Sequence, residues 1–309
     1  MLDLNARAKF RLSGSDRVRY LNGQVSNDIR KLGRHEVRPA CVMTAKGKMN
    51  GLIRVSATGE ALLIDVEEEL RESLSMRLER YIIADDAVLE DITEEHGLAH
   101  FLGFAGLPEE SLLPEGATWY RSKRFGVEGI DITGPRDALA SLVRGEGAIF
   151  EFLKAALEAS ASEEAGSEGA GREIFLVAAA TAEVLRIECG IPLWGRELDE
   201  NTIPVEAGLE SETIDYHKGC YIGQEIISRI KSIGRVNRNL RGFLLSAPVE
   251  PGVRLLDGEK EVGVLTSVAW SDALGATVAL GYLRRGTESA MLRAGTVEVQ
   301  ARPLPLLPL

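Results

Sequence analysis

The stretch that decides the fold assignment is Lys218-Gly219-Cys220-Tyr221-Ile222-Gly223-Gln224-Glu225. Two glycines bracket a cysteine, with a cation before it and a carboxylate after it. Glycine at these offsets lets the backbone turn tightly or come close to a ligand, and a nearby ammonium favours the thiolate of Cys220. The pattern makes Cys220 the first candidate for a functional residue. A buried, inert cysteine beside a turn remains the alternative, because free cysteine is among the most buried residue types.

The chain of 309 residues is long enough for two or three domains. Hydrophobic residues make up 45% of it, as in ordinary globular proteins. It contains no apolar run of the ~20 residues that span a bilayer, and its first residues lack the basic and apolar pattern of a signal peptide. We therefore expect a cytoplasmic protein with no membrane partner.

The net charge of −11 argues against broad binding to nucleic acid, which attracts Lys and Arg. The three cysteines, Cys41, Cys189 and Cys220, lie far apart in the sequence. Neither a disulphide framework nor a metal site is predicted from them. His217 lies three residues before Cys220, but one histidine and one cysteine do not make a metal site, so we expect a surface or hydrogen-bonded histidine.

Before residue 160 the pattern predicts an α+β arrangement. Helices are predicted from residue 17, over 67–81, over 134–144 and over 149–159. The segment 160–171 is small, polar and acidic, and we interpret it as a flexible loop rather than a phosphate loop. Strands are predicted at 8–12, 37–44, 49–55, 61–66, 87–92, 98–104, 118–121 and 129–133.

After the loop, residues 175–184 have helical character and 185–189 alternate like a strand. Five basic residues without an acidic one then lie between Ser228 and Gly242. This basic island indicates either an anionic ligand or a solvated helix face. Short strands at 242–246, 261–270, 277–283 and 296–302 predict a small antiparallel β-barrel at the end of the chain. The island consists of Arg229, Lys231, Arg235, Arg238 and Arg241.

Three blocks in this order resemble one known family. The octapeptide is similar to the signature of the YgfZ-type folate-binding proteins, relatives of the aminomethyltransferase of the glycine cleavage system. The blocks 186–192 and 203–209 resemble the conserved segments that precede it, and 14–28 with 46–48 resembles the first conserved block. The octapeptide is specific, whereas the other blocks alone are weak.

The resemblance implies an α+β fold of three domains in a cloverleaf around a central cleft, with a C-terminal antiparallel β-barrel. The expected boundaries are 1–45 with 117–235, then 46–116, then 236–309. It also implies tetrahydrofolate, or a derivative, as the cofactor. The implied role is accessory: assembly or repair of iron–sulphur clusters, with assembly proteins and iron–sulphur client enzymes, including tRNA-modifying ones, as partners of a monomer.

Several site residues follow from the resemblance. Glu188 is expected to hold the pterin, because a carboxylate can accept hydrogen bonds from its neighbouring amine and ring N–H. Arg186 and Arg229 are expected near the folate, the arginines of the island neutralising its glutamate tail, and Cys220 is expected to be a redox-sensitive thiol. The motif residues of the site are Lys218, Gly219, Cys220, Tyr221, Gly223, Gln224 and Glu225.

One position departs from the transferases of this family. Their hairpin carries an aspartate where this chain has Asn50 or Gly51, and an amide cannot act as a carboxylate base. We therefore expect an accessory protein rather than an enzyme, with Asn50 at the folate. The alternative is a folate-dependent one-carbon (aminomethyl) transferase or demethylase. Direct RNA binding by the basic island is a third hypothesis, which the net charge opposes.

Overall fold

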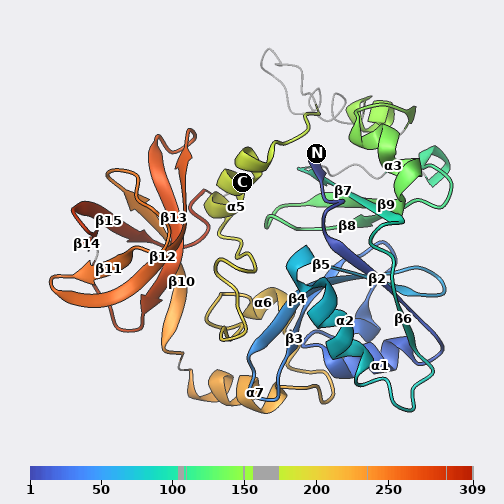
Figure 1. The fold of residues 1–309 in the computed structure, drawn as a ribbon, viewed down its shortest axis with the longest axis horizontal. Helices are drawn as coiled ribbons and strands as arrows, with labels where there is room; N and C mark the ends of the chain where they lie inside the picture. The colour runs from blue at the N-terminus through green and yellow to red at the C-terminus, as the bar shows by residue number, and fades with distance from the viewer. Residues whose placement is uncertain are drawn as a thin grey trace. The chain divides into compact units, whose positions relative to one another are not determined.

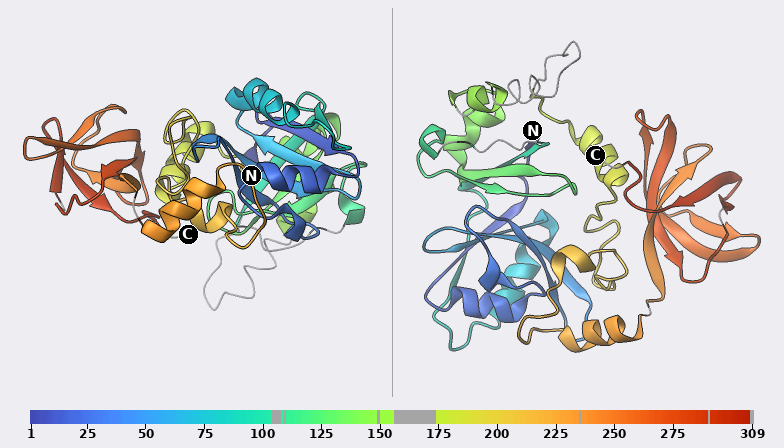
Figure 2. Two further views of the ribbon diagram at one scale, coloured as in Figure 1. Left: turned by 90° about the horizontal axis from the view of Figure 1, so that it is seen from below. Right: turned by 180° about the vertical axis from the view of Figure 1, so that it is seen from behind.

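The computed structural model describes residues 1–103, 108, 110–148, 150–155, 174–234, 236–289 and 291–307. The chain divides into two compact units, each made of separate stretches of sequence. The first unit comprises Met1–Arg17, Lys31–Arg38 and Arg54–Ala178. The second comprises Val18–Arg30, Pro39–Ile53 and Ala179–Leu309. Figures 1 and 2 show the chain from three directions.

A four-stranded sheet in the order β1-β7-β9-β8 lies in the first unit (Figure 1). Its apolar face carries Phe101, Ile130 and Ile132, which share a core with Leu139 and Leu142 of helix α3. Because successive strand residues point to opposite faces, the other face carries alternate residues such as His100 and Asp131. The strands are β1 (Leu2–Asp3), β7 (His96–Leu102), β8 (Thr118–Arg121) and β9 (Gly129–Pro135), and α3 is Arg136–Val143.

A second sheet has five strands in the order β3-β4-β5-β2-β6. The register places Lys9 opposite Asp65 and Asp65 opposite Arg54. Directly opposed residues point to the same face of a sheet, so these three charged side chains form one row. The strands are β2 (Ala8–Ser13), β3 (Arg38–Met43), β4 (Met49–Ala57), β5 (Leu62–Val66) and β6 (Val88–Asp91), each at a predicted position.

The helix predicted over 67–81 begins as a 3₁₀ turn, η2 (Glu68–Leu70), and continues as α2 (Arg71–Glu79). Leu70, Leu74 and Leu78 are buried along one side of it, as the spacing predicts. Another 3₁₀ turn, η3, covers Glu110–Leu112. Of the helix expected at 149–159, residues 150–155 are described and helical, whereas the rest of it and all of the loop expected at 160–171 lie outside the described residues.

The C-terminal barrel is confirmed as a closed antiparallel sheet in the order β10-β13-β12-β11-β14-β15, with β10 paired to β15. Buried side chains such as Phe243, Leu265 and Val299 form its core. Two of its short strands, β11 and β14, were not predicted. The strands are β10 (Arg238–Leu245), β11 (Arg254–Asp257), β12 (Lys260–Ser271), β13 (Ala276–Arg284), β14 (Met291–Ala294) and β15 (Val297–Arg302).

The strand predicted at 185–189 is wrong, because these residues are the last turns of helix α5 (Ala179–Cys189). Arg186, Ile187 and Glu188 are all buried. The helix lies beside the barrel (Figures 1 and 2), where Ile187 joins an apolar core and its two charged neighbours find polar partners on β12. Because the buried Arg186 and Glu188 flank the apolar Ile187, polar and apolar residues alternate here, and this is the pattern of a strand.

The rest of the second unit packs around the β3–β4 hairpin. Its core includes Met43, Met49, Leu209, Tyr221 and Ile227. The remaining helices are α1 (Arg17–Gln24), η1 (Ile29–Lys31), α6 (Glu210–Thr213) and α7 (Gln224–Ile233). The α+β class with a C-terminal barrel is thus confirmed, whereas the three domain boundaries stay a prediction. None of the described helices is long and apolar enough to cross a membrane.

Candidate functional site

Lys218 opens the octapeptide and is almost completely buried. Its ammonium donates to three backbone carbonyls, those of Asn22 and Val25 at 2.6 Å and of Asn27 at 2.8 Å. An ammonium has three N–H donors, so all of them are used within this turn. Burial lowers the pKa of Lys218 to about 8. The sequence assigned this lysine to the electrostatics of Cys220, but its geometry makes it a clamp on the segment after α1.

Gly223 and Gly47 bring the octapeptide against the β3–β4 hairpin. Both residues have positive φ, 90° and 70°. A methyl group on Gly223 would lie 2.8 Å from the Thr44 carbonyl oxygen and 3.4 Å from the Cα of Gly47, and one on Gly47 would lie 3.0 Å from Ile226 of α7. Two glycines are required because the two backbones approach more closely than any side chain permits.

Cys220 is exposed, which excludes the buried alternative. Cys41 is buried and Cys189 is half-buried, and burial raises the pKa of each thiol to about 11. Exposure and thiolate formation both favour reaction of a cysteine. Cys220 is therefore the thiol of this chain that a partner or oxidant can reach. His217 is also exposed, as expected.

The other octapeptide residues divide between core and surface. Tyr221 is buried in the hairpin core, its ring centroid 5.0 Å from the Lys218 ammonium, and burial raises the pKa of its hydroxyl to about 12. Gln224 and Glu225 form the first turn of α7, and Gly223 is its N-cap. Glu225 is exposed and lies 3.6 Å from Arg229 in an i,i+4 ion pair. Such an exposed pair contributes little to stability.

Glu188 is a buried carboxylate near the end of α5. Ser271 of β12 donates a hydrogen bond of 2.5 Å to its Oε1. No other hydrogen bond to this carboxylate is made by the described residues, although a carboxylate offers about four lone-pair sites. Its backbone carbonyl accepts from the backbone N–H of Leu306 at 2.7 Å. Glu188 is thus fixed in place and retains capacity to accept further hydrogen bonds.

Arg186 uses all five of its N–H donors within the protein. They bind the Glu183 carboxylate twice, the Glu197 carboxylate at 2.9 Å, the Ile191 carbonyl at 2.7 Å and the Ser267 hydroxyl at 2.7 Å. A guanidinium has five donors, so none remains for a ligand. Arg186 ties the end of α5 to the barrel. The sequence did not single out Glu197 or Ser267, because nothing separates Glu197 from the neighbouring acidic residues.

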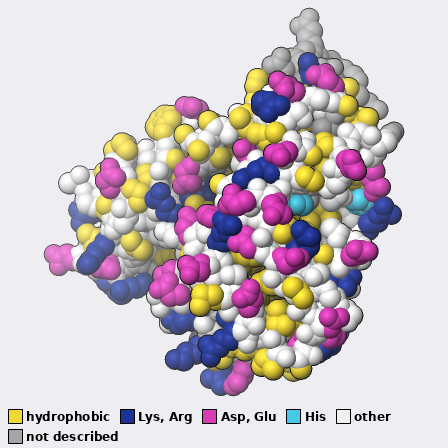
Figure 3. Space-filling view, turned by 45° about the vertical axis from the view of Figure 1, so that its right-hand side comes forward, with side chains coloured by type: hydrophobic (Ala, Val, Ile, Leu, Met, Phe, Trp, Pro, Cys, Tyr) yellow, Lys and Arg dark blue, Asp and Glu magenta, His cyan; other side chains and the backbone are white. Residues whose placement is uncertain are grey.

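Two members of the basic island, Lys231 and Arg238, contact aromatic rings of the protein. Arg238 donates to Glu206 at 3.0 Å and its guanidinium lies 4.1 Å from the centre of the Tyr282 ring. The Lys231 ammonium lies 3.4 Å from the centre of the Tyr216 ring. Arg229 is exposed on α7, and Arg235 is outside the described residues. Across most of the face drawn in Figure 3 acidic and basic side chains are interspersed, and basic side chains gather at its lower edge.

The predicted site residues therefore fall into two groups in the second unit. The octapeptide contacts the hairpin and the turn after α1, whereas Arg186 and Glu188 contact β12 of the barrel. Asn50 is half-buried in β4, the second strand of that hairpin. Among the described residues no set of three His, Cys, Asp or Glu side chains is arranged to hold a metal ion.

The barrel sequence matches a family model. Residues 238–306 match the glycine cleavage T-protein C-terminal barrel domain. A search of curated proteins finds the tRNA-modifying protein YgfZ of Yersinia pestis, 28% identical over 78% of this chain and 69% of the relative. The chain is thus similar to the aminomethyltransferases and the YgfZ-type proteins, and its C-terminal barrel matches the barrel domain of the T-protein family.

Other relatives extend the match along the whole chain. An aminomethyltransferase of Rubrobacter xylanophilus is 27% identical over 99% of this chain and 82% of the relative. The crystal structure of the glycine cleavage aminomethyltransferase T of Bartonella henselae has the same fold, with a TM-score of 0.79, 17% identity, and coverage of 99% of this chain and 85% of that one. The chain spans from 33% to 84% of the length of the curated relatives it matches.

Proposed function

We propose that this protein binds tetrahydrofolate, or a derivative, and supports the assembly or repair of iron–sulphur clusters, including those of tRNA-modifying enzymes. Glu188 is the observation that supports folate binding. Its buried carboxylate accepts one hydrogen bond, from the Ser271 hydroxyl, and can accept two more. Similarity to the aminomethyltransferases and the YgfZ-type proteins supports the same ligand. A relative named as a tRNA-modifying protein supports the link to tRNA modification.

Each site residue takes a distinct role in this proposal. The Glu188 carboxylate accepts the amine and ring N–H of the pterin, while Arg186, with its donors already used, positions the end of α5 rather than touching folate. Asn50 contributes an amide from β4. Arg229, exposed on α7, neutralises the glutamate tail. The proposed protein is a cytoplasmic monomer of three domains that does not bind nucleic acid directly.

We predict that Glu188→Gln binds tetrahydrofolate about 10–100-fold more weakly than the wild type. The amide keeps the size of the side chain and can still accept from Ser271. The neutral amide cannot form the two charge-assisted hydrogen bonds that the carboxylate would accept from the pterin. A hydrogen bond to a charged group contributes about 1.5–3 kcal/mol, so the loss of affinity should be large. Calorimetric titration under anaerobic conditions measures the affinity. Glu200→Gln, an exposed substitution in the same unit, is the control and should bind as the wild type does. Equal affinity of Glu188→Gln and wild type would remove Glu188 from the site.

For the thiol we predict that Cys220→Ala fails to restore iron–sulphur enzyme activity in a deletion strain under oxidative stress. Cys220 is the exposed thiol, whereas Cys189 is half-buried with a raised pKa. Cys189→Ala therefore serves as the matched control and should complement. The readout is the activity of an iron–sulphur enzyme in extracts, at equal protein levels. Full complementation by Cys220→Ala would show that the thiol is dispensable.

A one-carbon transferase is the second candidate, because an aminomethyltransferase aligns with 99% of this chain. Against it, Met49, Asn50 and Gly51 provide no carboxylate in the hairpin. Formation of methylenetetrahydrofolate from an aminomethyl or N-methyl donor distinguishes the two. Turnover by the purified wild type would favour the transferase, and folate binding without turnover favours the accessory role.

A further inference from the structure

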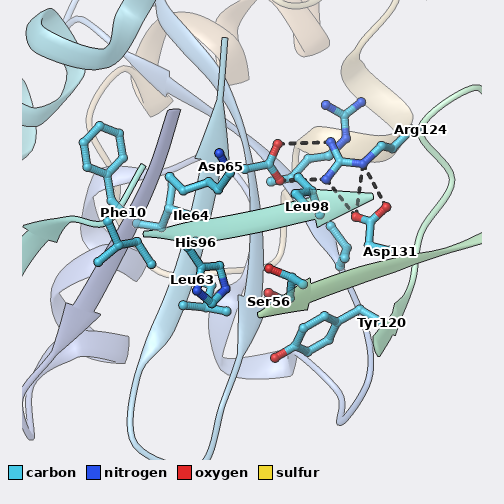
Figure 4. A pocket seen from close by; sticks show the side chains of 15 residues that line it. Phe10, Ser56, Leu63, Ile64, Asp65, His96, Leu98, Tyr120, Arg124 and Asp131 are labelled. Atoms are coloured by element: carbon cyan, nitrogen blue, oxygen red, sulfur yellow. Dashed lines mark hydrogen bonds and ion pairs between the residues drawn. The ribbon is translucent and has the colours of Figure 1, made fainter. Parts of the chain in front are cut away.

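The first unit contains a pocket of about 30 Å³ between its two sheets, separate from the octapeptide and from α5. Residues of β2, β4 and β5 line one side and residues of β7, β8 and β9 line the other. Figure 4 shows its charged and polar side chains. The lining includes the titratable residues Lys9, Arg54, Asp65, His96, Tyr120, Arg124 and Asp131.

The charged lining follows from strand register. Arg54, Asp65 and Lys9 are directly opposed on β4, β5 and β2, so they project from one face. On the other sheet, Asp131 is opposite His100. An interface between sheets normally buries apolar residues from both inner faces. Here the facing rows are ionic, which requires an internal partner for each charge.

Most of these charges have such a partner. Arg124 bridges the two carboxylates, at 2.8 Å from Asp65 and 2.7 Å from Asp131, as Figure 4 shows. Asp65 also binds Arg7, and Asp131 also binds the His100 ring at 2.8 Å. The network lowers the pKa of Asp131 to about 2, despite burial. Both carboxylates are therefore ionised and already paired with cations.

Lys9 is satisfied by neutral groups. Its ammonium donates to the backbone carbonyls of Asn5 and Arg7, at 2.9 and 2.6 Å. Burial lowers its pKa to about 8, which leaves it mainly protonated at neutral pH. Lys9 adds positive charge to the pocket without drawing on either carboxylate.

Arg54 is the remaining charged residue of the pocket lining. Among the described residues, none makes a hydrogen bond or an ion pair with its guanidinium. The pocket lining holds three cations, Lys9, Arg54 and Arg124, against two carboxylates, a surplus of one positive charge. Burial, together with the charges of Arg124 and Arg7, lowers the pKa of Arg54 to about 10. The side chain of Arg54 is half-buried, and a partly desolvated guanidinium without a partner favours the binding of an anion.

His96 provides a second group without a partner on the pocket wall. Its Nε2 is buried, and no described residue forms a hydrogen bond with it. Burial and the charges of Lys9 and Arg11 lower its pKa to about 4, so the imidazole is neutral at neutral pH. A neutral imidazole has one N–H donor, which can lie on Nε2.

We propose that this pocket binds one small monovalent anion, a halide or a carboxylate of the size of formate. The Arg54 guanidinium supplies the opposite charge and His96 supplies an N–H. One water needs about 10–15 Å³ of such a volume, so the space admits only two or three atoms of that size. None of the lining residues belongs to the proposed folate site, and the two proposals can fail separately.

Thermal unfolding at constant sodium concentration tests the site. Replacing gluconate, which is too large for the pocket, by formate or by chloride should raise the Tm of the wild type by about 2–4 °C. Comparing the rise in Tm in formate with the rise in chloride shows which of the two anions binds. Arg54→Met should lose this rise. The response is the difference in Tm between the two salts for the same protein, so a change in the stability of Arg54→Met itself does not enter the comparison.

Arg11→Met is the matched control, because Arg11 lies on β2 with a side chain 44% exposed. It should keep the full response to the anion. An equal response in Arg54→Met and wild type, or no response in the wild type, would overturn the proposal.

Bromide gives a readout that needs no variant. In crystals of the wild type soaked in sodium bromide, we expect an anomalous peak in contact with the Arg54 guanidinium. Peaks at surface arginines alone would contradict the site.

Discussion

Replacing Lys218 by methionine is expected to lower the free energy of unfolding by about 3–5 kcal/mol. The substitution leaves the carbonyls of Asn22, Val25 and Asn27 buried without their donor, and each group of this kind costs about 1–3 kcal/mol. Urea unfolding followed by fluorescence measures the change. The loss is large because one ammonium satisfies three backbone acceptors at once.

Lys46→Met is the control for Lys218, since Lys46 is an exposed lysine of the same unit. It should change stability by less than about 0.5 kcal/mol. The difference between wild type and Lys218→Met should also grow as the pH rises from 8 towards 10. The folded pKa of about 8 lies below the ordinary 10.5, so between these values the unfolded chain binds more protons. Equal stability of Lys218→Met and Lys46→Met would show that the three hydrogen bonds of the Lys218 ammonium do not stabilise the protein.

Gly223→Ala is expected to lower the free energy of unfolding by about 3 kcal/mol or more. The new methyl group would lie 2.8 Å from the Thr44 carbonyl oxygen, and the backbone at φ 90° is unfavourable for a residue with a side chain. Either the hairpin or the start of α7 must move. The measurement is the same urea titration, with hydrogen exchange of the hairpin amides to locate the change.

Gly219→Ala separates this contact from a general need for glycine in the octapeptide. A methyl group on Gly219 would meet nothing within 4 Å, and no positive φ is found there. We expect its stability to stay within about 0.5 kcal/mol of the wild type. If both alanine variants were equally destabilised, the close approach to the hairpin would not be the cause.

Regular alternation made much of the fold predictable. The strands of the five-stranded sheet and the long strands of the barrel were found because each buries one face or both. The short strand β11 was missed, although Gly258 and Glu259 after it form a two-residue turn of the kind that joins the strands of a hairpin. Helix α5 was misassigned because Arg186 and Glu188 are buried beside hydroxyls of β12, which lies some eighty residues later.

The candidate site was predictable only in part. The octapeptide identified Cys220 as the residue to inspect, and the structure exposes it. The partners of Lys218 could not be inferred, because they are main-chain atoms nearly two hundred residues earlier. Arg54 was not singled out either. Its lack of a partner depends on Asp65 being already bound by Arg7 and Arg124, a competition that no local pattern records.

The Lys218 clamp also bears on how this protein can diverge. Because its three acceptors are peptide carbonyls, the side chains at Asn22, Val25 and Asn27 are not selected through this contact. Substitutions there that keep the backbone path leave the lysine satisfied, whereas any change of the lysine is felt by all three. The contact should therefore constrain the lysine without paired substitutions at the three positions, where Asn22 and Asn27 are constrained separately by hydrogen bonds of their own side chains.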